Sequence, residues 1–365
     1  MTTRPLSETR LPDGIPVHVH DHVKADGRGL TLYGYAPLSD EPVPGGLDGA
    51  GPGAELRWHP LLSRWSVYAA HRQHRTFMPS AADDPLAPSV PGGPVTEIEF
   101  PDFEVAVFQN RFASLHPEAA APAPPPGVRG GTAAGDCEVV VFSREPTGSL
   151  ATLGQDRRRL IVGAWIDRYA RHHAAGAAYV LPFESRGAEV GVTLPHPHGQ
   201  VYAFPFVPSE QALAARAFAE GYDLAGEMAA WDAYTVETAG PLRAFVPPFA
   251  RYPYEVWIAG AEPAQGPWDY NAEAFDAYAY LLGRVTARYD AVFGLTAEDQ
   301  ATPTLMSLHA APGGASPGYQ FTTQFYCLMR APGRLKYLAT VEQATGVFTV
   351  DVMPEAAAKT LREAL

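Results

Sequence analysis

Residues 195–200 read PHPHGQ, a stretch in which two prolines and two histidines alternate. Proline fixes its own φ and disfavours the helical region for the residue before it, so this stretch is predicted to be extended. In extended chain, positions i, i+2 and i+4 point to one side, so His196, His198 and Gln200 are expected to share one face. Because proline has no N–H to donate, the segment is predicted to be an edge strand or a strand end that opens onto a ligand.

The overall composition narrows the class of protein. The chain has 365 residues and is 46% hydrophobic, which suits one large domain or two smaller ones. The first residues hold no apolar signal segment, and no run approaches the roughly 18 apolar residues of a membrane helix, so we expect a cytoplasmic protein without a membrane partner. A formal net charge of −13 disfavours nucleic acid as a partner, since that binding depends on neutralising phosphates. Cys137 and Cys327 are too few for a disulfide framework or a cysteine-rich zinc module.

The pattern of apolar residues predicts an α+β fold with a mainly antiparallel sheet and flanking helices. Alternating β-branched and aromatic residues predict strands over residues 64–68, 95–100, 104–108, 138–143 and 178–183. Apolar residues at steps of three and four predict helices over residues 157–173, 209–230 and 271–293, and residues 354–365 are predicted to form a helix with proline in its first turn. Two segments rich in Pro, Gly and Ala, residues 40–54 and 117–136, are predicted to be exposed loops.

Three kinds of chemistry suit the HPHGQ stretch. A neutral imidazole has a pKa of about 6.5, so it is available in cytoplasm as a base, a nucleophile or a metal ligand. The His-x-His spacing supplies two ligands of a metal site, or it is simply a polar strand end. Alternatively, one histidine attacks phosphorus to form a covalent nucleotidyl intermediate while the glutamine holds a phosphoryl oxygen. The spacing alone favours the metal or the structural interpretation.

The residues around the motif resemble the galactose-1-phosphate uridylyltransferase family, the branch of the histidine-triad superfamily in which glutamine replaces the third histidine. PHPHGQ followed by VYA is similar to that family's active-site signature. The resemblance continues through ELRWHPLLSRWSVYAAHRQHRTFMPS, VFQNRFASL, FESRGAEVGVTLPHPHGQ, PFARYPYEVWIAG and APGRLKYLATVE. It implies two fused histidine-triad-like halves, residues 55–235 and 236–365, after an N-terminal extension and loop over residues 1–54. It also implies a homodimer whose active sites use both chains.

The resemblance also implies roles for individual residues. His198 would attack the α-phosphorus of a nucleoside diphosphate sugar, release a sugar 1-phosphate, and pass the uridylyl or related nucleotidyl group to a second sugar 1-phosphate. The main-chain carbonyl of His196 would orient the ring of His198, and Gln200 would bind a phosphoryl oxygen. The other implied contacts are with phosphate for Arg72, Arg75, Ser185, Gly191 and Thr193, with the nucleoside for Asn110 and Phe112, and with the hexose for Lys336, Tyr337 and Glu342.

Several of these residues also fit a purely structural interpretation. Phe112 and Tyr337 suit an apolar core as well as a ligand contact. Lys336 and Glu342 suit an ordinary exposed ion pair, which contributes little to stability.

The metal ligands of the family are mostly missing from this chain. Members with a structural zinc carry Cys-x-x-Cys where this sequence has Asp84-Pro85-Leu86-Ala87, and a third ligand is replaced at or near Pro146, so only His196 is kept. At a second site His309 is kept, but Thr322 and Gln324 replace a later histidine pair. Because a tetrahedral zinc site needs four ligands, we expect no cofactor and the loss of both the family zinc and the family iron.

At several positions expected near the substrate this sequence differs from the family, so the nucleobase and the sugar are not determined by the resemblance. Arg111 stands where many relatives have aspartate, Ser185 where asparagine is common, and residues 339–342 (ATVE) differ from the usual sugar strand. Two further hypotheses are therefore kept. One is a phosphorylase or hydrolase of nucleoside diphosphate sugars or dinucleoside polyphosphates that uses the same histidine. The other is a catalytically silent nucleotide-sugar binding protein.

Overall fold

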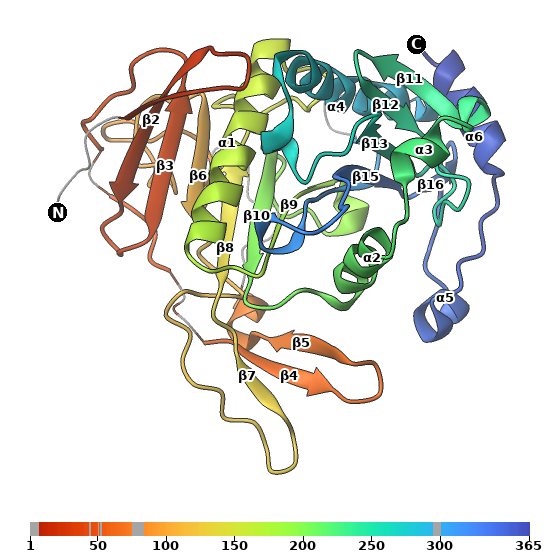
Figure 1. Ribbon diagram of the computed structural model, residues 1–365. Coiled ribbons are helices and arrows are strands. Elements are labelled where there is room, and N and C mark those ends of the chain that lie inside the picture. Colours follow the sequence, from red (N-terminus) through yellow and green to blue (C-terminus); the bar gives the residue numbers. More distant parts are fainter. Residues whose placement is uncertain (1–6, 44, 50, 52, 75–83, 295–300) are drawn as a thin grey trace.

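The structure is a computed structural model that describes residues 7–43, 45–49, 51, 53–74, 84–294 and 301–365 (Figure 1). It is built on a 12-stranded sheet whose neighbouring strands are all antiparallel. In spatial order the strands are β1 (Ser7–Arg10), β2 (Pro16–Val23), β3 (Gly29–Gly34), β6 (Val105–Gln109), β8 (Asp136–Val141), β10 (His198–Phe204), β9 (Tyr179–Arg186), β14 (Thr304–His309), β15 (Thr322–Cys327), β13 (Val256–Gly260), β12 (Leu242–Phe245) and β11 (Thr235–Ala239). The predicted α+β fold with mainly antiparallel sheet is confirmed.

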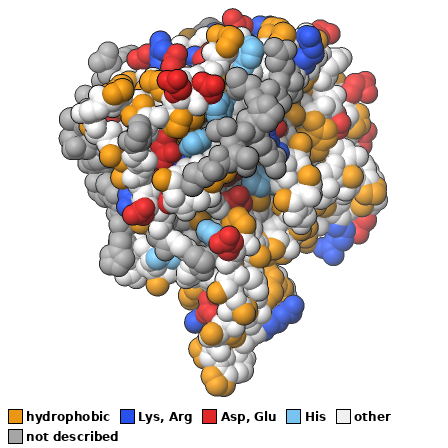
Figure 2. All heavy atoms as spheres, turned by 90° about the vertical axis from the view of Figure 1, so that its left-hand side faces the viewer, with side chains coloured by type: hydrophobic (Ala, Val, Ile, Leu, Met, Phe, Trp, Pro, Cys, Tyr) orange, Lys and Arg blue, Asp and Glu red, His pale blue; other side chains and the backbone are white. Residues whose placement is uncertain are grey.

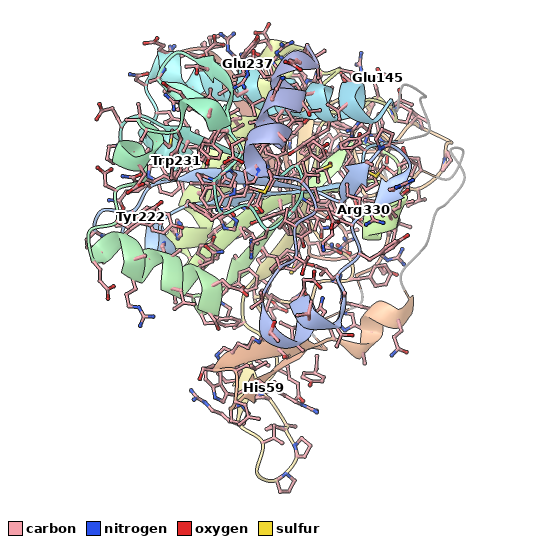
Figure 3. The ribbon with its side chains drawn as sticks, turned by 90° about the vertical axis from the view of Figure 1, so that its right-hand side faces the viewer. His59, Glu145, Tyr222, Trp231, Glu237 and Arg330 are labelled. Atoms are coloured by element: carbon pink, nitrogen blue, oxygen red, sulfur yellow. The ribbon has the colours of Figure 1, made fainter. Side chains whose placement is uncertain are left out.

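Smaller elements surround this sheet. A three-stranded sheet joins β5 (Arg64–Tyr68), β4 (Glu55–His59) and β7 (Gly130–Thr132), and β16 (Met329–Ala331) pairs with β17 (Arg334–Leu335). The α-helices are α1 (Gln155–Ala174), α2 (Ser209–Ala219), α3 (Leu224–Met228), α4 (Ala272–Phe293), α5 (Thr340–Thr345) and α6 (Pro354–Glu363). His59 marks the three-stranded sheet at one end of the molecule, and Glu237 of β11 lies at the other end (Figure 3).

Helices α1 and α4 cover one face of the large sheet. Trp165 of α1 and Tyr278 of α4 are fully buried in the same apolar cluster as Val140 of β8 and Val201 of β10. Helix α4 begins where the side chain of Asn271 accepts the N–H of Ala274, which satisfies one of the free N–H groups of the first turn. This packing closes the helix-covered face of β8 and β10 to a ligand.

The other face of the sheet carries the alternate residues of the same strands. Val139 and Val141 of β8 belong to a second apolar cluster. Residues paired across an antiparallel ladder point to the same side, so His198, opposite Val141, and Gln200, opposite Val139, lie on this second face. Segments without regular secondary structure, including residues 84–103, pack over part of it. The candidate catalytic residues therefore face away from α1 and α4.

Most of the predicted elements are confirmed. The helices predicted over residues 157–173, 271–293 and 354–365 are α1, α4 and α6, and the strands predicted over residues 64–68, 104–108, 138–143 and 178–183 are β5, β6, β8 and β9. Cys137 and Cys327 are both free and buried. Among the helices of the described ranges, none combines the length and the apolar character needed to cross a bilayer.

Three predicted elements differ from the structure. The helix over residues 209–230 is divided into α2 and α3, because Gly221 adopts φ 99° and the side chain of Asp223 starts a new helix by accepting the N–H of Gly226. Residues 95–100 form a single bridge, between Ile98 and Pro88, rather than a strand. The loop predicted over residues 117–136 contains β7, which pairs with β4.

Residues 7–34, which the sequence analysis assigned to an N-terminal extension, add β1, β2 and β3 to the edge of the large sheet. In β2 apolar residues alternate with histidine and aspartate, which is the pattern of a half-buried strand. The division of the chain at residues 54 and 235 remains a prediction.

Candidate active site

His198 is the first residue of β10 and is partly exposed. Its Nδ1 lies 2.7 Å from the main-chain oxygen of His196, so Nδ1 carries the hydrogen and donates it to that carbonyl. Burial lowers the pKa of His198, although the hydrogen bond to His196 opposes the shift. The ring is therefore neutral at neutral pH, and its Nε2, which has no hydrogen-bond partner among the described residues, holds a free electron pair.

The strand that carries His198 is central in the sheet, so the predicted edge position is wrong. β10 pairs with β8 on one side and with β9 on the other. The two prolines precede the strand rather than interrupt it, and the carbonyl of Pro197 still accepts the N–H of Phe142 at 3.0 Å. The alternative prediction, a strand end, agrees with the position of His198 at the first residue of β10.

His196 does not share the face of His198 and Gln200, which corrects the prediction for these three residues. It precedes β10 and is 1% exposed. Its Nδ1 lies 2.6 Å from Asp84 Oδ2, and its Nε2 donates to the main-chain oxygen of Ser143 at 2.7 Å. Burial favours a raised pKa for Asp84, but the hydrogen bond and charge of His196 lower it overall, so this carboxyl group is ionised. Both nitrogens of His196 are thus occupied by oxygen atoms of the protein, one of them a carboxylate oxygen of Asp84.

Gln200 lies two residues along β10 and meets the predicted nucleoside segment. Asn110 Nδ2 donates to Gln200 Oε1 at 3.4 Å, and Asn110 Oδ1 accepts the N–H of Phe112 at 2.9 Å. The guanidinium of Arg72 donates to the main-chain oxygen of Phe112 at 2.6 Å. These contacts connect Arg72, through Phe112 and Asn110, to the strand of the candidate nucleophile. Arg75 itself lies outside the described residues.

The predicted phosphate contacts come from β9 and from the turn that follows it. Gln200 pairs with Phe183, and this register continued by two residues places Ser185 across from His198. Gly191 is exposed and adopts φ 78°, a left-handed conformation that favours glycine. Thr193 is half-buried in the same turn. The roles of Ser185, Gly191 and Thr193 in binding phosphate remain predictions.

The predicted hexose residues lie around α5. Lys336 Nζ donates to Glu342 Oε1 at 2.9 Å, and the two side chains are 9% and 1% exposed, so the alternative of an exposed ion pair is wrong. The second carboxylate oxygen of Glu342 accepts the N–H of Ala339 at the start of α5. Tyr337 is 75% exposed, which excludes its alternative role as a core aromatic. Whether any of these three side chains contacts a sugar remains a prediction.

The positions of the family metal ligands do not suit an ion in this chain. Both ring nitrogens of His196 are hydrogen-bonded to protein atoms, so neither offers an electron pair to zinc. At the second position, His309 Nδ1 meets the hydroxyl of Tyr179 at 3.0 Å and its Nε2 meets the hydroxyl of Ser307 at 2.8 Å.

A different set of side chains could hold a cation. Asp136 and Glu138 of β8 and His172 of α1 place one ligand atom each within 4.8 Å of one another. Within this group His172 Nε2 lies 2.8 Å from Glu138 Oε2, and Arg168 lies 3.3 Å from Glu138 Oε1. The expectation of no cofactor is thus left open by the structure, although Arg168 already compensates much of this charge.

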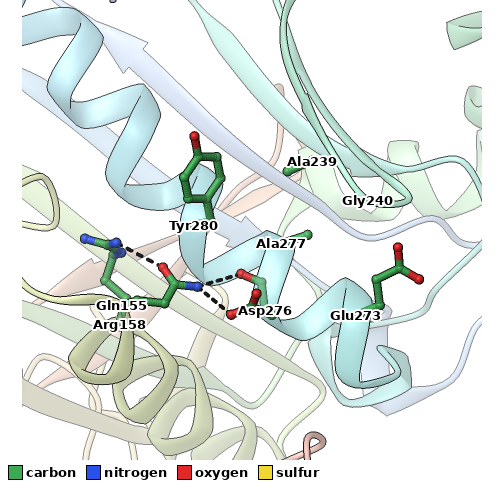
Figure 4. A pocket seen from close by; sticks show the side chains of 8 residues that line it. All are labelled: Gln155, Arg158, Ala239, Gly240, Glu273, Asp276, Ala277 and Tyr280. Carbon is green, nitrogen blue, oxygen red and sulfur yellow. Dashed lines mark hydrogen bonds between the residues drawn. The ribbon is translucent and has the colours of Figure 1, made fainter.

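A surface pocket lies apart from His198, between the first turn of α1 and α4 (Figure 4). Gln155 accepts from Arg158 at 3.0 Å and donates to the main-chain oxygen of Asp276 at 2.9 Å, so it bridges the two helices. Glu273 and Tyr280 of α4 also line this pocket. Because α1 and α4 cover the opposite face of the sheet, this pocket is not part of the candidate active site.

Sequence reasoning missed two groups of residues. The sequence shows Asp84 only in the segment that replaces the zinc-binding Cys-x-x-Cys, whereas in the structure it pairs with His196, and no local signal connects residues that are so far apart in the chain. The histidines of β2 were also missed, although VHVHDHV shows the same alternation of imidazoles that drew attention to HPHGQ. Because alternate residues of a strand point to the same side, His18, His20 and His22 lie on one face of β2.

Comparisons with known proteins agree with this arrangement. The family described as galactose-1-phosphate uridyl transferase, N-terminal domain, matches residues 53–208, which include His198. A galactose-1-phosphate uridylyltransferase of Thermotoga maritima is 32% identical over 332 residues, which span 85% of this chain and 98% of that protein. One of Streptomyces lividans is 32% identical over 361 residues, or 93% of this chain and 96% of that protein. A solved structure of a uridylyltransferase is similar with a TM-score of 0.75 and 26% identity, covering 85% of this chain and 98% of the other.

Proposed function

The chain belongs to the galactose-1-phosphate uridylyltransferase family, and from this premise we propose that it transfers a uridylyl group between sugar 1-phosphates with His198 as the nucleophile. The protein is then a nucleotidyltransferase enzyme that acts on a nucleoside diphosphate sugar and a sugar 1-phosphate. One observation supports the role of His198 above all: Nδ1 is held by the carbonyl of His196 at 2.7 Å, which leaves Nε2 unprotonated on a partly exposed ring.

The proposed reaction has two displacements at the α-phosphorus. In the first, Nε2 of His198 forms a bond to phosphorus, the bond from phosphorus to the bridging oxygen breaks, and a hexose 1-phosphate leaves with that electron pair. In the second, an oxygen of another sugar 1-phosphate attacks the nucleotidyl-histidine, and the bond to Nε2 breaks. The proton on Nδ1 stays in its hydrogen bond with His196 throughout, so the ring needs no external base.

The surrounding side chains have the chemistry to stabilise the charge that develops during each displacement. In this proposal the amide of Gln200 and the hydroxyl of Ser185 bind phosphoryl oxygens, and the main-chain amides of the turn at Gly191 add further donors. Arg72 and Arg75 supply positive charge in a chain whose formal net charge is −13. We propose that Asn110 and Phe112 hold the nucleoside.

The identity of the sugar is the less constrained part of the proposal. We propose that Lys336, Tyr337 and Glu342 bind the hexose in a homodimer. Tyr337 is exposed, so its side chain is free to contact the sugar. Arg111 contacts the main-chain oxygen of Asp48 at 2.7 Å and its guanidinium lies 5.3 Å from the ring of Phe112, so it borders the proposed nucleoside position.

Mass spectrometry of the intact protein tests the mechanism. After incubation with UDP-glucose, UDP-galactose or ADP-glucose, the wild-type protein should gain the mass of one nucleoside monophosphate, and the mass identifies the base. His198→Ala should abolish the adduct. His59→Ala is the matched control, because His59 is an exposed histidine of the three-stranded sheet and should leave the adduct intact.

The acceptor then separates the remaining hypotheses. Galactose 1-phosphate should discharge the adduct and form a new nucleoside diphosphate sugar, whereas discharge by inorganic phosphate or water alone would indicate a phosphorylase or hydrolase. Binding of the nucleotide sugar without an adduct would indicate a silent binding protein and would refute the proposal.

A further inference from the structure

A series of hydrogen bonds leads from Asp84 through His196 to the proposed nucleophile. Asp84 Oδ2 lies 2.6 Å from Nδ1 of His196, and the main-chain oxygen of His196 accepts the Nδ1–H of His198 at 2.7 Å. The proposed reaction uses this main-chain oxygen but gives no role to the ring of His196 or to Asp84. The two side chains that precede the nucleophile in this series therefore need an explanation.

The ring of His196 joins three segments that are distant in the sequence. Its Nδ1 meets Asp84, which belongs to the irregular segment over the face of the sheet that carries His198. Its Nε2 lies 2.7 Å from the main-chain oxygen of Ser143, shortly after the end of β8. Because His196 is buried, water cannot readily replace either partner. Contacts at both nitrogens thus fix the orientation of the ring.

Asp84 is itself anchored by contacts other than the one with His196. Its Oδ1 accepts the N–H of Leu86 at 2.9 Å, and Leu86 is buried in the same apolar cluster as Val141 of β8. The main-chain oxygen of Pro85 accepts the N–H of Glu97 at 2.8 Å. The carboxylate is therefore a fixed point against which the ring of His196 can be held.

The main chain on both sides of His196 is also restrained. Leu194, two residues before it, packs against the apolar cluster that contains Leu86. The carbonyl of Pro197, the residue after it, accepts the N–H of Phe142 at 3.0 Å. Since the ring of His196 is attached to this short stretch of backbone, a ring that lost its orientation would displace the main-chain oxygen that holds His198.

Burial distinguishes this pair from the ionisable groups at the surface. Histidine and carboxylate side chains also lie at the surface, on the face that carries the N-terminal strands (Figure 2). Exposed ion pairs contribute little to stability. The side chains of Asp84 and His196, in contrast, are largely buried, and among the described residues His196 is the only basic side chain within 4.0 Å of Asp84. Removal of one member of a buried pair leaves the other without its partner.

We propose that Asp84 is a positioning residue: by holding the ring of His196, it fixes the main-chain oxygen that keeps the hydrogen of His198 on Nδ1 and leaves Nε2 free to react. This inference rests on the proposed role of His198 as the nucleophile. In it the carboxylate of Asp84, rather than a metal ion, joins its segment to His196, because an ion at either ring nitrogen would have to displace Asp84 or Ser143. The geometry of the nucleophile is then independent of a bound metal.

Nitrogen NMR of the full-length protein, with isotope-labelled histidine and without substrate, tests this positioning. The chemical shift of a ring nitrogen differs between its protonated and unprotonated forms, and His198→Ala identifies the signals of His198 by their loss. In wild type, Nδ1 of His198 should be protonated and Nε2 unprotonated. In Asp84→Ala both signals should move to intermediate values, as expected for a mixture of tautomers. Asp84→Asn keeps an oxygen that can accept a hydrogen bond from His196, so it should shift them less.

Glu237→Ala is the matched control. The side chain of Glu237 is 15% exposed, close to the 12% of Asp84, and its carboxylate lies 2.7 Å from Arg288. Glu237 belongs to β11, which is an edge strand of the large sheet, whereas β10 is central. This variant also loses an ion pair and should be less stable than wild type, but its His198 signals should be those of wild type.

The rate of adduct formation with UDP-glucose provides a second measurement. In a single turnover, Asp84→Ala should form the nucleotidyl-enzyme about 10–100-fold more slowly, since a displacement of about 1 Å can cost about 100-fold. The concentration of UDP-glucose that gives half the maximal rate should change by less than about three-fold, because Asp84 holds the nucleophile rather than the substrate. Glu237→Ala, and wild type treated with a chelator, should react at the wild-type rate.

Three results would overturn the proposal: an unchanged His198 tautomer in Asp84→Ala, equal effects in Glu237→Ala, or a loss of activity in chelator-treated wild type that Zn²⁺ restores. If Asp84→Ala does not fold, Asp84→Asn decides, and wild-type signals together with a wild-type rate in that variant would refute the role of Asp84. Failure of the proposed function gives a different result, because wild type would then form no adduct while the tautomer of His198 still responded to Asp84.

Discussion

Gly199 separates the proposed nucleophile from Gln200, and a Gly199→Ala substitution tests how strictly the sheet positions them. A Cβ at this position would lie 2.8 Å from the main-chain oxygen of Phe183 in β9 and 2.9 Å from Cζ of Phe142. Ordinary contacts of a Cβ begin near 3.4 Å, so either β10 or its neighbours must move by about 0.6 Å. One of the two obstacles is backbone of the adjacent strand, which cannot rotate away as a flexible side chain would.

The size of the effect follows from this geometry. Overpacking of a close-packed interior costs about 1–3 kcal/mol, so the free energy of unfolding should fall by that amount. A misplacement of about 1 Å can reduce a rate by about 100-fold, so a shift of roughly half that size in His198 should slow formation of the nucleotidyl-enzyme by about 10-fold.

The assay is single-turnover formation of the nucleotidyl-enzyme, measured by rapid quenching, together with unfolding in urea. Gly154→Ala is the matched control, because a Cβ there meets nothing within 4 Å and the residue adopts φ −61° before α1. If Gly199→Ala forms the adduct within two-fold of the wild-type rate and unfolds at the same urea concentration, close packing against β9 and Phe142 does not position His198.

Two further predictions concern charged groups. The interaction with His196 lowers the pKa of Asp84, although burial alone would raise it. The stability that this ionised carboxylate contributes is present above about pH 4 and is lost as the pH falls. The Asp84→Asn variant should therefore have a lower melting temperature at neutral pH and should form the adduct more slowly. A melting temperature of Asp84→Asn equal to that of wild type at neutral pH would contradict this prediction. Burial raises the pKa of Glu184 to about 7, so wild type should lose stability as the pH rises from about 4.5 through 7, whereas Glu184→Gln should not. Urea unfolding at about pH 5 and about pH 8 checks this, and parallel changes in both proteins would contradict it.

The elements were predictable where a local period determines them. The apolar stripe of residues 271–293 predicts α4 to within one residue, because a helix that packs on a sheet must repeat its buried face every three or four residues. In the same way, the alternation of apolar and polar residues in VHVHDHV predicts the strand β2. Residue composition did not predict the structure of residues 96–100. Several of these residues are β-branched or aromatic, which is typical of a strand, yet all five are buried and form no ladder.

The sequence alone therefore determined the extended geometry around HPHGQ and most of the helices, because backbone preference and side-chain period act between near neighbours, whereas His198 was indicated as the nucleophile by the resemblance to the family. Only the tertiary structure decided that β10 is central, that both nitrogens of His196 are occupied by Asp84 and Ser143, and that one nitrogen of His198 is free. Those outcomes depend on atoms supplied by distant segments, and the protonation and reactivity of an imidazole follow from the partners that folding brings to it.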